Sequence, residues 1–181
     1  LANVDMTAEF AVKLGAAYAS TLKAGSQIMI SRDQRSISRM ISRSLVSGLM
    51  SVGINVQNLE ATALPISRFA ARNLGVTGGI HVRLHPDRSD FILIEFFDEH
   101  GINLSKAKEK KIEGAFFKED FRRAAIEEIG NVTYPSQILE SYAAEFEKLL
   151  HISHRNQRQF KVVIDYVYAV SGAVLPLLLN K

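Results

Sequence analysis

The stretch GGIHVRLHP, residues 78–86, decides the fold of this chain. Its apolar residues alternate with His81 and Arg83, which is the period of a β-strand with one apolar and one polar face. Pro86 ends the strand because proline has no N–H to donate to a sheet. A second apolar run at 91–97 follows too closely for a helical crossover, so we expect these two strands to pair antiparallel.

Helices and strands alternate in the part of the chain that precedes this stretch. Apolar residues spaced three and four apart predict helices, and glycines that can adopt a left-handed conformation end them. The expected helices are 8–24, 36–52 and 65–74, and the expected strands are 27–30 and 54–59. Such alternation produces parallel strands with helices on both faces. We therefore predict a three-layer α/β/α domain with a mixed, mostly parallel sheet of four strands.

Composition limits the classes of function. The chain has 181 residues, enough for one domain and part of another, and no cysteine, which excludes disulfides and thiolate chemistry. No apolar run reaches the roughly 18 residues that a membrane span needs, so we expect a cytoplasmic protein without a membrane partner. The net charge is only +3, and the basic clusters lack interleaved aromatic residues. We therefore expect no nucleic-acid partner.

The chain divides into three predicted parts. A charged helix at 105–113 and an amphipathic helix at 134–149 complete a domain at 1–150. A polar linker follows at 151–160, and 161–181 reads as the beginning of a second domain that is cut short. We expect a strand at 161–165 that pairs with the edge of the main sheet or with another copy of the chain. We also expect the chain to be a piece of a longer protein.

Motifs in a fixed order give the chain a family resemblance. The turn RDQR at 32–35 resembles the RDTR turn of the α-D-phosphohexomutases, that is, phosphoglucomutase and phosphomannomutase. The pattern of Gly48, Leu49, Ser51 and Gly53 resembles the end of that family's second helix. Matches also occur at 79–80, at 96–101 and at 162–166 with Pro176. The resemblance covers nearly the whole chain and implies the fold of the phosphoglucomutase first domain.

The main departure from the family lies in the loop after the strand at 78–84. The resemblance implies a serine there that carries the transferred phosphate, and its position falls on His85. Imidazole is a competent nucleophile, so His85 could carry phosphate, but we expect an inactive replacement. Ser89, the nearby hydroxyl, is the alternative nucleophile.

Four other residues are candidates for a substrate or phosphate loop: Arg32, Asp33, Arg35 and Arg83. The guanidinium groups of Arg32 and Arg35 can hold a phosphate, or these arginines can pair with Asp33 and brace the His85 loop. Both alternatives remain open. Arg83 shares a strand face with His81, and the two can form a polar layer under a helix.

Two further clusters receive ordinary structural interpretations. Asp98, Glu99 and His100 are expected in a solvated turn, and the pair at 116–117 is expected in the core or in packing between domains. We predict no metal ligands in this chain. The family resemblance implies that magnesium ligands lie in a later domain, so we expect no cofactor here and leave Mg²⁺ open for the parent protein.

The runs at 79–84 and 119–123 resemble one branch more closely, namely the mutase-like region fused to bacterial mannose-1-phosphate guanylyltransferases. That resemblance implies a sugar-nucleotide enzyme in which this part is a non-catalytic scaffold or regulatory domain and is not an enzyme alone. The alternative is an active phosphomannomutase or phosphoglucomutase that interconverts hexose 1- and 6-phosphates with a non-standard loop. An unrelated α/β binding module would require the ordered motifs to be coincidental. Expected partners are a phosphorylated hexose and the parent's other domains, and a homo-oligomer is left open.

Overall fold

The computed structural model describes residues 1–150 and 161–179. Its centre is a sheet in the order β4-β3-β1-β2-β5, in which β4 runs antiparallel to β3 and all other neighbours are parallel. The strands are β1 Gln27–Arg32, β2 Asn55–Ala61, β3 Gly78–Leu84, β4 Ile92–Asp98 and β5 Val132–Thr133. The α-helices are α1 Ala8–Ser20, α2 Ser36–Met50, α3 Leu64–Asn73, α4 Lys106–Lys118, α5 Ile138–Leu150 and α6 Leu175–Leu179.

The fold class is the one predicted, but the sheet has five strands instead of four. The fifth strand, β5, has only two residues, Val132 and Thr133, which pair with Val56 and Gln57 of β2. Two residues are too few for an alternating pattern, and for this reason the sequence did not indicate the strand. β5 nevertheless covers the edge of β2, which would otherwise present free backbone groups.

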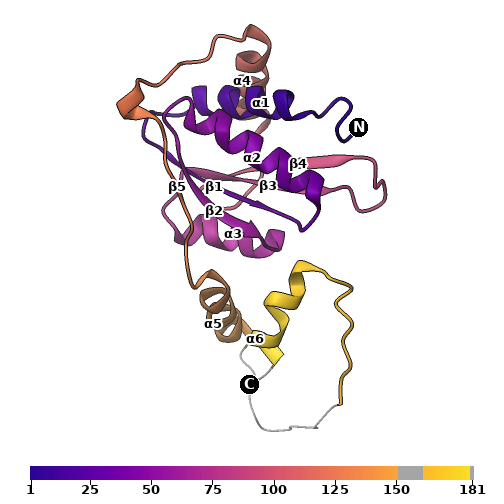
Figure 1. Ribbon diagram of the computed structural model, residues 1–181. Helices are drawn as coiled ribbons and strands as arrows, with labels where there is room; N and C mark the ends of the chain where they lie inside the picture. Colours follow the sequence, from indigo (N-terminus) through magenta and orange to yellow (C-terminus); the bar gives the residue numbers. More distant parts are fainter. Residues whose placement is uncertain (151–160, 180–181) are drawn as a thin grey trace.

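Helices cover both faces of the sheet (Figure 1). α1 and α2 lie on one face, with α4 packed beside α1, and α3 lies on the other face. The core between α1, α2 and the sheet contains fully buried aliphatic side chains, including Ile28, Ile41, Leu45 and Ile80. A smaller cluster on the α3 side contains Met29 and Phe97. The two clusters fix the positions of the parallel strands. They thereby also fix where the turns at the ends of these strands begin.

α1 and α2 cross with their backbones in contact. A Cβ atom on Gly48 would lie 2.1 Å from the carbonyl oxygen of Val12, and one on Gly15 would lie 2.4 Å from that of Leu45. No side chain fits at such distances, so the crossing requires glycine at both positions. This close approach lets both helices pack against the same face of the sheet.

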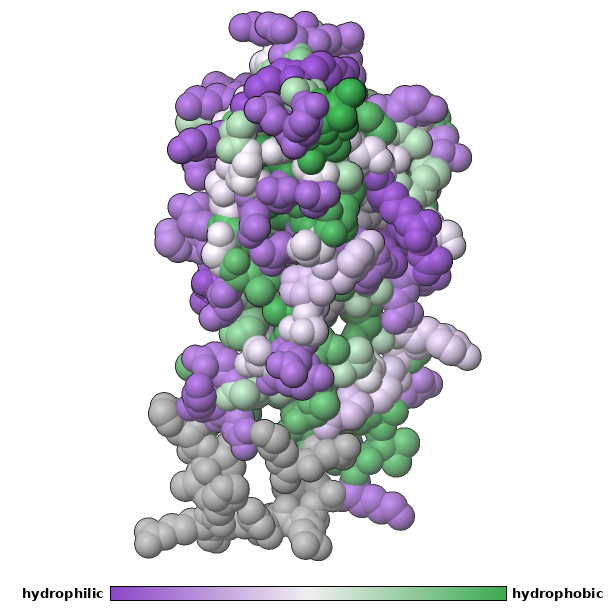
Figure 2. All heavy atoms as spheres, turned by 60° about the vertical axis from the view of Figure 1, so that its left-hand side comes forward, coloured by the Kyte–Doolittle hydropathy of each residue, from purple (hydrophilic) through white to green (hydrophobic). Residues whose placement is uncertain are grey.

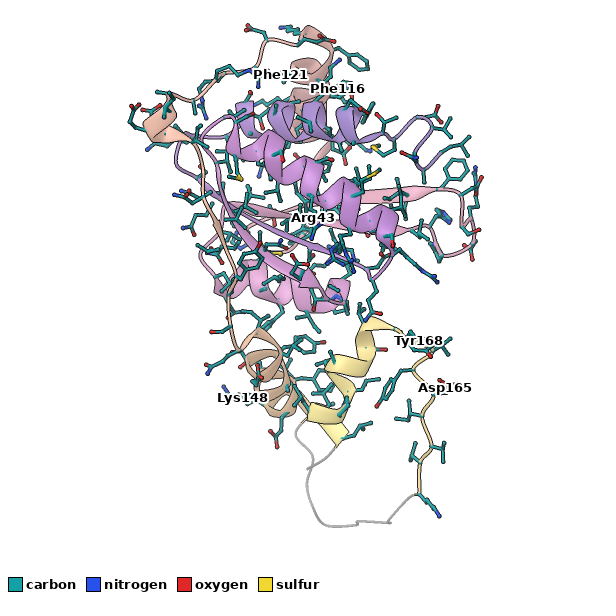
Figure 3. All side chains as sticks on the ribbon, viewed as in Figure 1. Arg43, Phe116, Phe121, Lys148, Asp165 and Tyr168 are labelled. Carbon is teal, nitrogen blue, oxygen red and sulfur yellow. The ribbon has the colours of Figure 1, made fainter. Side chains whose placement is uncertain are left out.

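α4 is longer than predicted and includes the aromatic pair in its last turn. Phe116 packs on Phe10 of α1 with ring centroids 4.7 Å apart, and Figure 3 shows it at the α1 side of the helix. Phe117 is 78% exposed. Its ring lies edge-on to that of Phe116, with centroids 5.5 Å apart, so only Phe116 of this pair has an aromatic contact with another helix.

The predicted strand at 161–165 does not pair with the main sheet, and its pairing with another copy of the chain stays a prediction. These residues have no strand pairing, and they form an exposed, extended segment in which Val163 is 91% exposed. A short 3₁₀ helix, Val170–Ala173, follows this segment, and α6 comes after it. α6 packs against α5 (Figure 1). Figure 2 shows hydrophobic side chains gathered at this lower end of the molecule. The run VVI at 162–164 has β-forming residues but no neighbouring strand edge among the described residues.

The predicted linker at 151–160 lies outside the described residues, and the division into domains stays a prediction. None of the helices in 1–150 and 161–179 combines the length and the apolar character that a bilayer crossing requires.

Candidate functional site

The sequence-predicted site residues lie at the carboxyl ends of the parallel strands. Arg32 is the last residue of β1, Asp33 and Arg35 follow in the turn to α2, and His85 follows β3. Ligands of open α/β sheets bind at this edge, because the turns that leave neighbouring strands meet there. The fold therefore places these residues at one edge of the sheet, on neighbouring strands.

Asp33 connects two of these turns. Its Oδ2 accepts a hydrogen bond from the backbone N–H of Leu84 at 2.8 Å, and its Oδ1 accepts one from the N–H of Arg35 at 2.9 Å. Its own N–H donates to the carbonyl oxygen of Val82 at 2.9 Å. Asp33 thereby braces the end of β3, from which the His85 loop departs. The bracing carboxylate binds backbone groups and not the guanidinium groups of the two arginines.

The Arg32 side chain is buried and has its own partner. Its Nη2 forms an ion pair with the carboxylate of Glu60, at the end of β2, and its Nη1 donates to the carbonyl oxygen of Asp33 at 3.0 Å. Glu60 was not among the predicted site residues, although the turn that begins at this residue follows the second predicted strand, 54–59, and was therefore expected at the same sheet edge as Arg32.

Arg35 is exposed and makes no ion pair within the described residues. It stands at the N-cap position of α2, where no side chain caps the helix. A depression of about 540 Å³ lies beside it, lined by Asp33, Gln34, Arg35 and residues 167–170. Figure 3 shows Tyr168 in this C-terminal segment, and 95% of that residue is exposed.

The loop between β3 and β4 holds both candidate nucleophiles. His85 is half-buried, and its backbone N–H donates to the carbonyl oxygen of Phe91 at 2.9 Å, which closes the loop. The ring Nδ1 of His85 accepts a hydrogen bond from the N–H of Asp87 at 3.2 Å, so Nε2 is the ring nitrogen left for other chemistry. Ser89 is exposed, and the guanidinium of Arg88 lies 3.3 Å from the centroid of the Phe91 ring.

The expected polar layer beneath a helix is present. His81 Nδ1 and Ser31 Oγ are 2.8 Å apart, and Ser31 Oγ and Ser67 Oγ of α3 are 2.7 Å apart. Burial lowers the pKa of His81 to about 4, so its ring is neutral at pH 7. On the same strand face, Arg83 Nε donates to Glu95 Oε2 at 2.6 Å. This layer fixes β3 against α3.

Asp98, Glu99 and His100 form the turn that follows β4. Asp98 Oδ1 accepts hydrogen bonds from the N–H groups of His100 at 2.9 Å and Ile102 at 3.0 Å, so this carboxylate caps the turn. Within 1–150 and 161–179 there is no group of three acidic, histidine or cysteine side chains that could hold a metal ion.

Comparison with known proteins identifies the family. The family model for phosphoglucomutase/phosphomannomutase, alpha/beta/alpha domain I, matches residues 1–123. A phosphoglucomutase/phosphomannomutase of Thermococcus kodakarensis is 28% identical in an alignment of 185 positions, which covers 100% of this chain and 40% of that protein. A phosphoglucosamine mutase of Natranaerobius thermophilus is 28% identical over 183 residues, again with 100% and 40% coverage.

A solved structure has the same fold. The phosphoglucomutase/phosphomannomutase family protein of Burkholderia thailandensis superposes with a TM-score of 0.63 at 18% sequence identity, and the match covers 75% of this chain and 31% of that one. The chain thus spans about two fifths of the length of the curated relatives it matches. Because the family model covers residues 1–123 of 181, the chain belongs to the phosphoglucomutase/phosphomannomutase family, whose alpha/beta/alpha domain I it contains.

Proposed function

We propose that this chain is the phosphohexomutase-like first domain of a larger sugar-phosphate or sugar-nucleotide enzyme, and that the domain does not carry the transferred phosphoryl group. The parent that we propose is a fusion with a mannose-1-phosphate guanylyltransferase, in which this domain is a scaffold or a regulatory element. Its partners would be the other domains of the parent and a phosphorylated hexose, and Mg²⁺ would bind outside this chain.

The observation that carries the proposal is that two of the arginines at this end of the sheet, Arg32 and Arg83, already form ion pairs with carboxylates of the same chain. Phosphoryl transfer requires a nucleophile beside cationic groups that stabilise the charge of the transferred phosphate. Here Glu60 pairs with Arg32, and the loop offers His85 with one ring nitrogen already bonded to its own loop. Arg83 is paired as well, with Glu95. These contacts favour a domain that has kept the fold without the phosphoryl chemistry.

The alternative is an active phosphomannomutase or phosphoglucomutase that uses the His85 loop. Two observations favour it: Asp33 still braces the loop, and Nε2 of His85 is not part of the loop's hydrogen bonding. The relatives named above are themselves described as mutases. In this alternative, phosphorylated Nε2 would give its phosphoryl group to the free hydroxyl of a hexose monophosphate, and the resulting hexose bisphosphate would return its other phosphoryl group to Nε2.

The two functions can be separated with the full-length parent protein. It would be supplied with mannose 1-phosphate, Mg²⁺ and a catalytic amount of hexose 1,6-bisphosphate, and formation of mannose 6-phosphate would be followed. We expect no turnover, with formation of GDP-mannose from GTP and mannose 1-phosphate in a parallel assay. Mutase turnover that disappears in His85→Ala and persists in Ser89→Ala would establish the alternative. Absence of nucleotidyl transfer would refute the proposed fusion.

A further inference from the structure

Two donors from neighbouring strands hold the carboxylate of Glu60. Arg32 Nη2 contacts one oxygen, Oε2, and Asn58 Nδ2 donates to the other, Oε1, at 2.9 Å. The Arg32 side chain is 7% exposed, whereas that of Glu60 is 44% exposed. The carboxylate therefore helps to shield a guanidinium group from solvent at the edge where the parallel strands end.

The backbone at Glu60 is strained so that its side chain can reach this position. Its φ angle is 55°, a left-handed conformation that costs a residue other than glycine about 1 kcal/mol. The pairing of β1 with β2 is irregular at the same place: Ile30 pairs with Asn58, but Arg32 pairs with Ala61, which leaves one extra residue on β2. Such a bulge changes the direction of side chains and is common beside functional sites.

Asn58 stabilises the strained turn. Its Oδ1 accepts a hydrogen bond from the N–H of Glu60 at 2.8 Å, while its Nδ2 binds the Glu60 carboxylate. The same side chain thus fixes both the backbone and the carboxylate of Glu60. Strained backbone that neighbouring groups hold in place in this way is concentrated at functional sites.

A depression of about 330 Å³ adjoins the carboxylate. Both Asn58 and Glu60 line it, together with Thr62, Tyr134 and Gln137 among others. Tyr134 is 66% exposed, so an aromatic ring stands free at this site. The rest of the lining is mostly apolar, with the carboxylate of Glu140 as a second charge. Apolar walls with a few hydroxyl and amide groups, around a space of this size, suit a small molecule such as a hexose.

We propose that Arg32 and Asn58 form an oxyanion subsite, that Glu60 occupies it as an internal ligand, and that its external ligand is a phosphate monoester of a hexose. One oxygen of the phosphate would take the place of Oε2 on Arg32 and another that of Oε1 on Asn58, with the sugar in the adjoining depression. An external phosphate must displace Glu60, so this carboxylate keeps the affinity of the subsite low. The choice of a hexose as the esterified group rests on the proposed function.

The test removes the internal ligand and measures the binding of inorganic phosphate to the chain by isothermal titration calorimetry. Glu60→Gly and Glu60→Asn both shorten the side chain and remove its charge, and both residues tolerate the left-handed backbone. We expect each variant to bind phosphate at least about tenfold more tightly than the original chain, since two vacant donors replace an occupied site.

Two matched variants locate the effect. Arg32→Gln combined with Glu60→Asn should lose the gain in affinity, because the guanidinium group is absent. Glu127→Gln removes an exposed negative charge that does not line this depression, so it should leave phosphate affinity unchanged within about twofold. Thermal melting would show that each variant is folded.

The proposal would be overturned if both folded Glu60 variants bound phosphate no more tightly than the original chain, or if the double variant kept the gain. A second titration with mannose 1-phosphate tests the hexose part. We expect it to bind the Glu60→Asn variant more tightly than inorganic phosphate does, and equal affinities would refute the placement of the sugar. Neither titration depends on mutase or nucleotidyltransferase activity, so failure here is distinct from failure of the proposed function.

Discussion

The Asp33 carboxylate accepts a hydrogen bond from the backbone N–H of Leu84 at 2.8 Å, although the two residues are 51 positions apart in the chain. The same carboxylate accepts one from the N–H of Arg35. One side chain thus connects the turn after β1 to the end of β3. The position of the His85 loop therefore depends on a residue of another loop.

Replacement of Asp33 by alanine should lower the free energy of unfolding by about 2 kcal/mol, because two backbone N–H groups lose a charged acceptor. Asp33→Asn keeps one acceptor oxygen, so it should lose about half as much. Urea unfolding measures both values. Asp87→Ala, in the exposed part of the His85 loop, is the control and should stay within about 0.5 kcal/mol of the original chain. Equal losses for Asp33→Ala and Asp87→Ala would contradict the bracing role.

Gly48→Ala should destabilise the chain by about 2 kcal/mol or more, since the new Cβ would lie 2.1 Å from the carbonyl oxygen of Val12. α1 and α2 would have to separate, and the sheet face below them would lose packing. The midpoint of thermal unfolding measures the effect. Gly114→Ala is the matched control in α4, where a Cβ would meet no atom within 4 Å. It should raise stability by about 0.5 to 1 kcal/mol, because alanine favours the helix more than glycine does. A Gly48→Ala chain as stable as the original would refute the close helix crossing.

The stability of the chain should fall as the pH decreases from about 6.5 towards 4. His81 has a folded-state pKa of about 4 because it is buried, whereas its ordinary value is 6.5. Between these values the unfolded chain binds a proton that the folded chain does not. This proton favours unfolding by up to about 1.4 kcal/mol per pH unit. Below pH 4 both states carry the proton and this contribution no longer changes.

Urea unfolding at several pH values would measure this dependence. His81→Asn keeps a polar group near Ser31 and should flatten the pH dependence between 4 and 6.5. His100→Asn changes an exposed histidine and should leave the dependence as it is. An unchanged slope in His81→Asn would exclude His81 as the group responsible.

Phe97→Ala should cost about 3 to 5 kcal/mol, because this ring is fully buried between the sheet and Arg68. Phe117→Ala should cost less than about 0.5 kcal/mol, since 78% of that residue is exposed. Denaturant unfolding of the two variants compares a core ring with a surface ring. A large loss for Phe117→Ala would mean that this ring is covered in the protein in solution.

Most of the fold could be predicted from local patterns. Alternation of apolar and polar residues at 78–84 indicated β3, and the helical spacing before it indicated two of the crossover helices, because both patterns depend on which face a residue must bury. β5 and the run at 162–164 show where such patterns fail. The first has too few residues to alternate. The second has strand-forming residues, but none of the strands in 1–150 and 161–179 pairs with it.

The candidate site was predicted only in part. Arg32, Asp33 and His85 could be named because they follow predicted parallel strands. Their partners could not, since a residue's partner depends on the register of strands that are distant in the chain. By itself, the sequence determined four of the five strands, that they are mostly parallel and which turns share an edge, because these follow from local periodicity and chain connectivity. Only the tertiary structure decided that Asp33 accepts a hydrogen bond from the end of β3 and that Glu60 forms an ion pair with Arg32. The second contact forms because a bulge in β2 and a left-handed backbone at Glu60 direct its carboxylate towards β1.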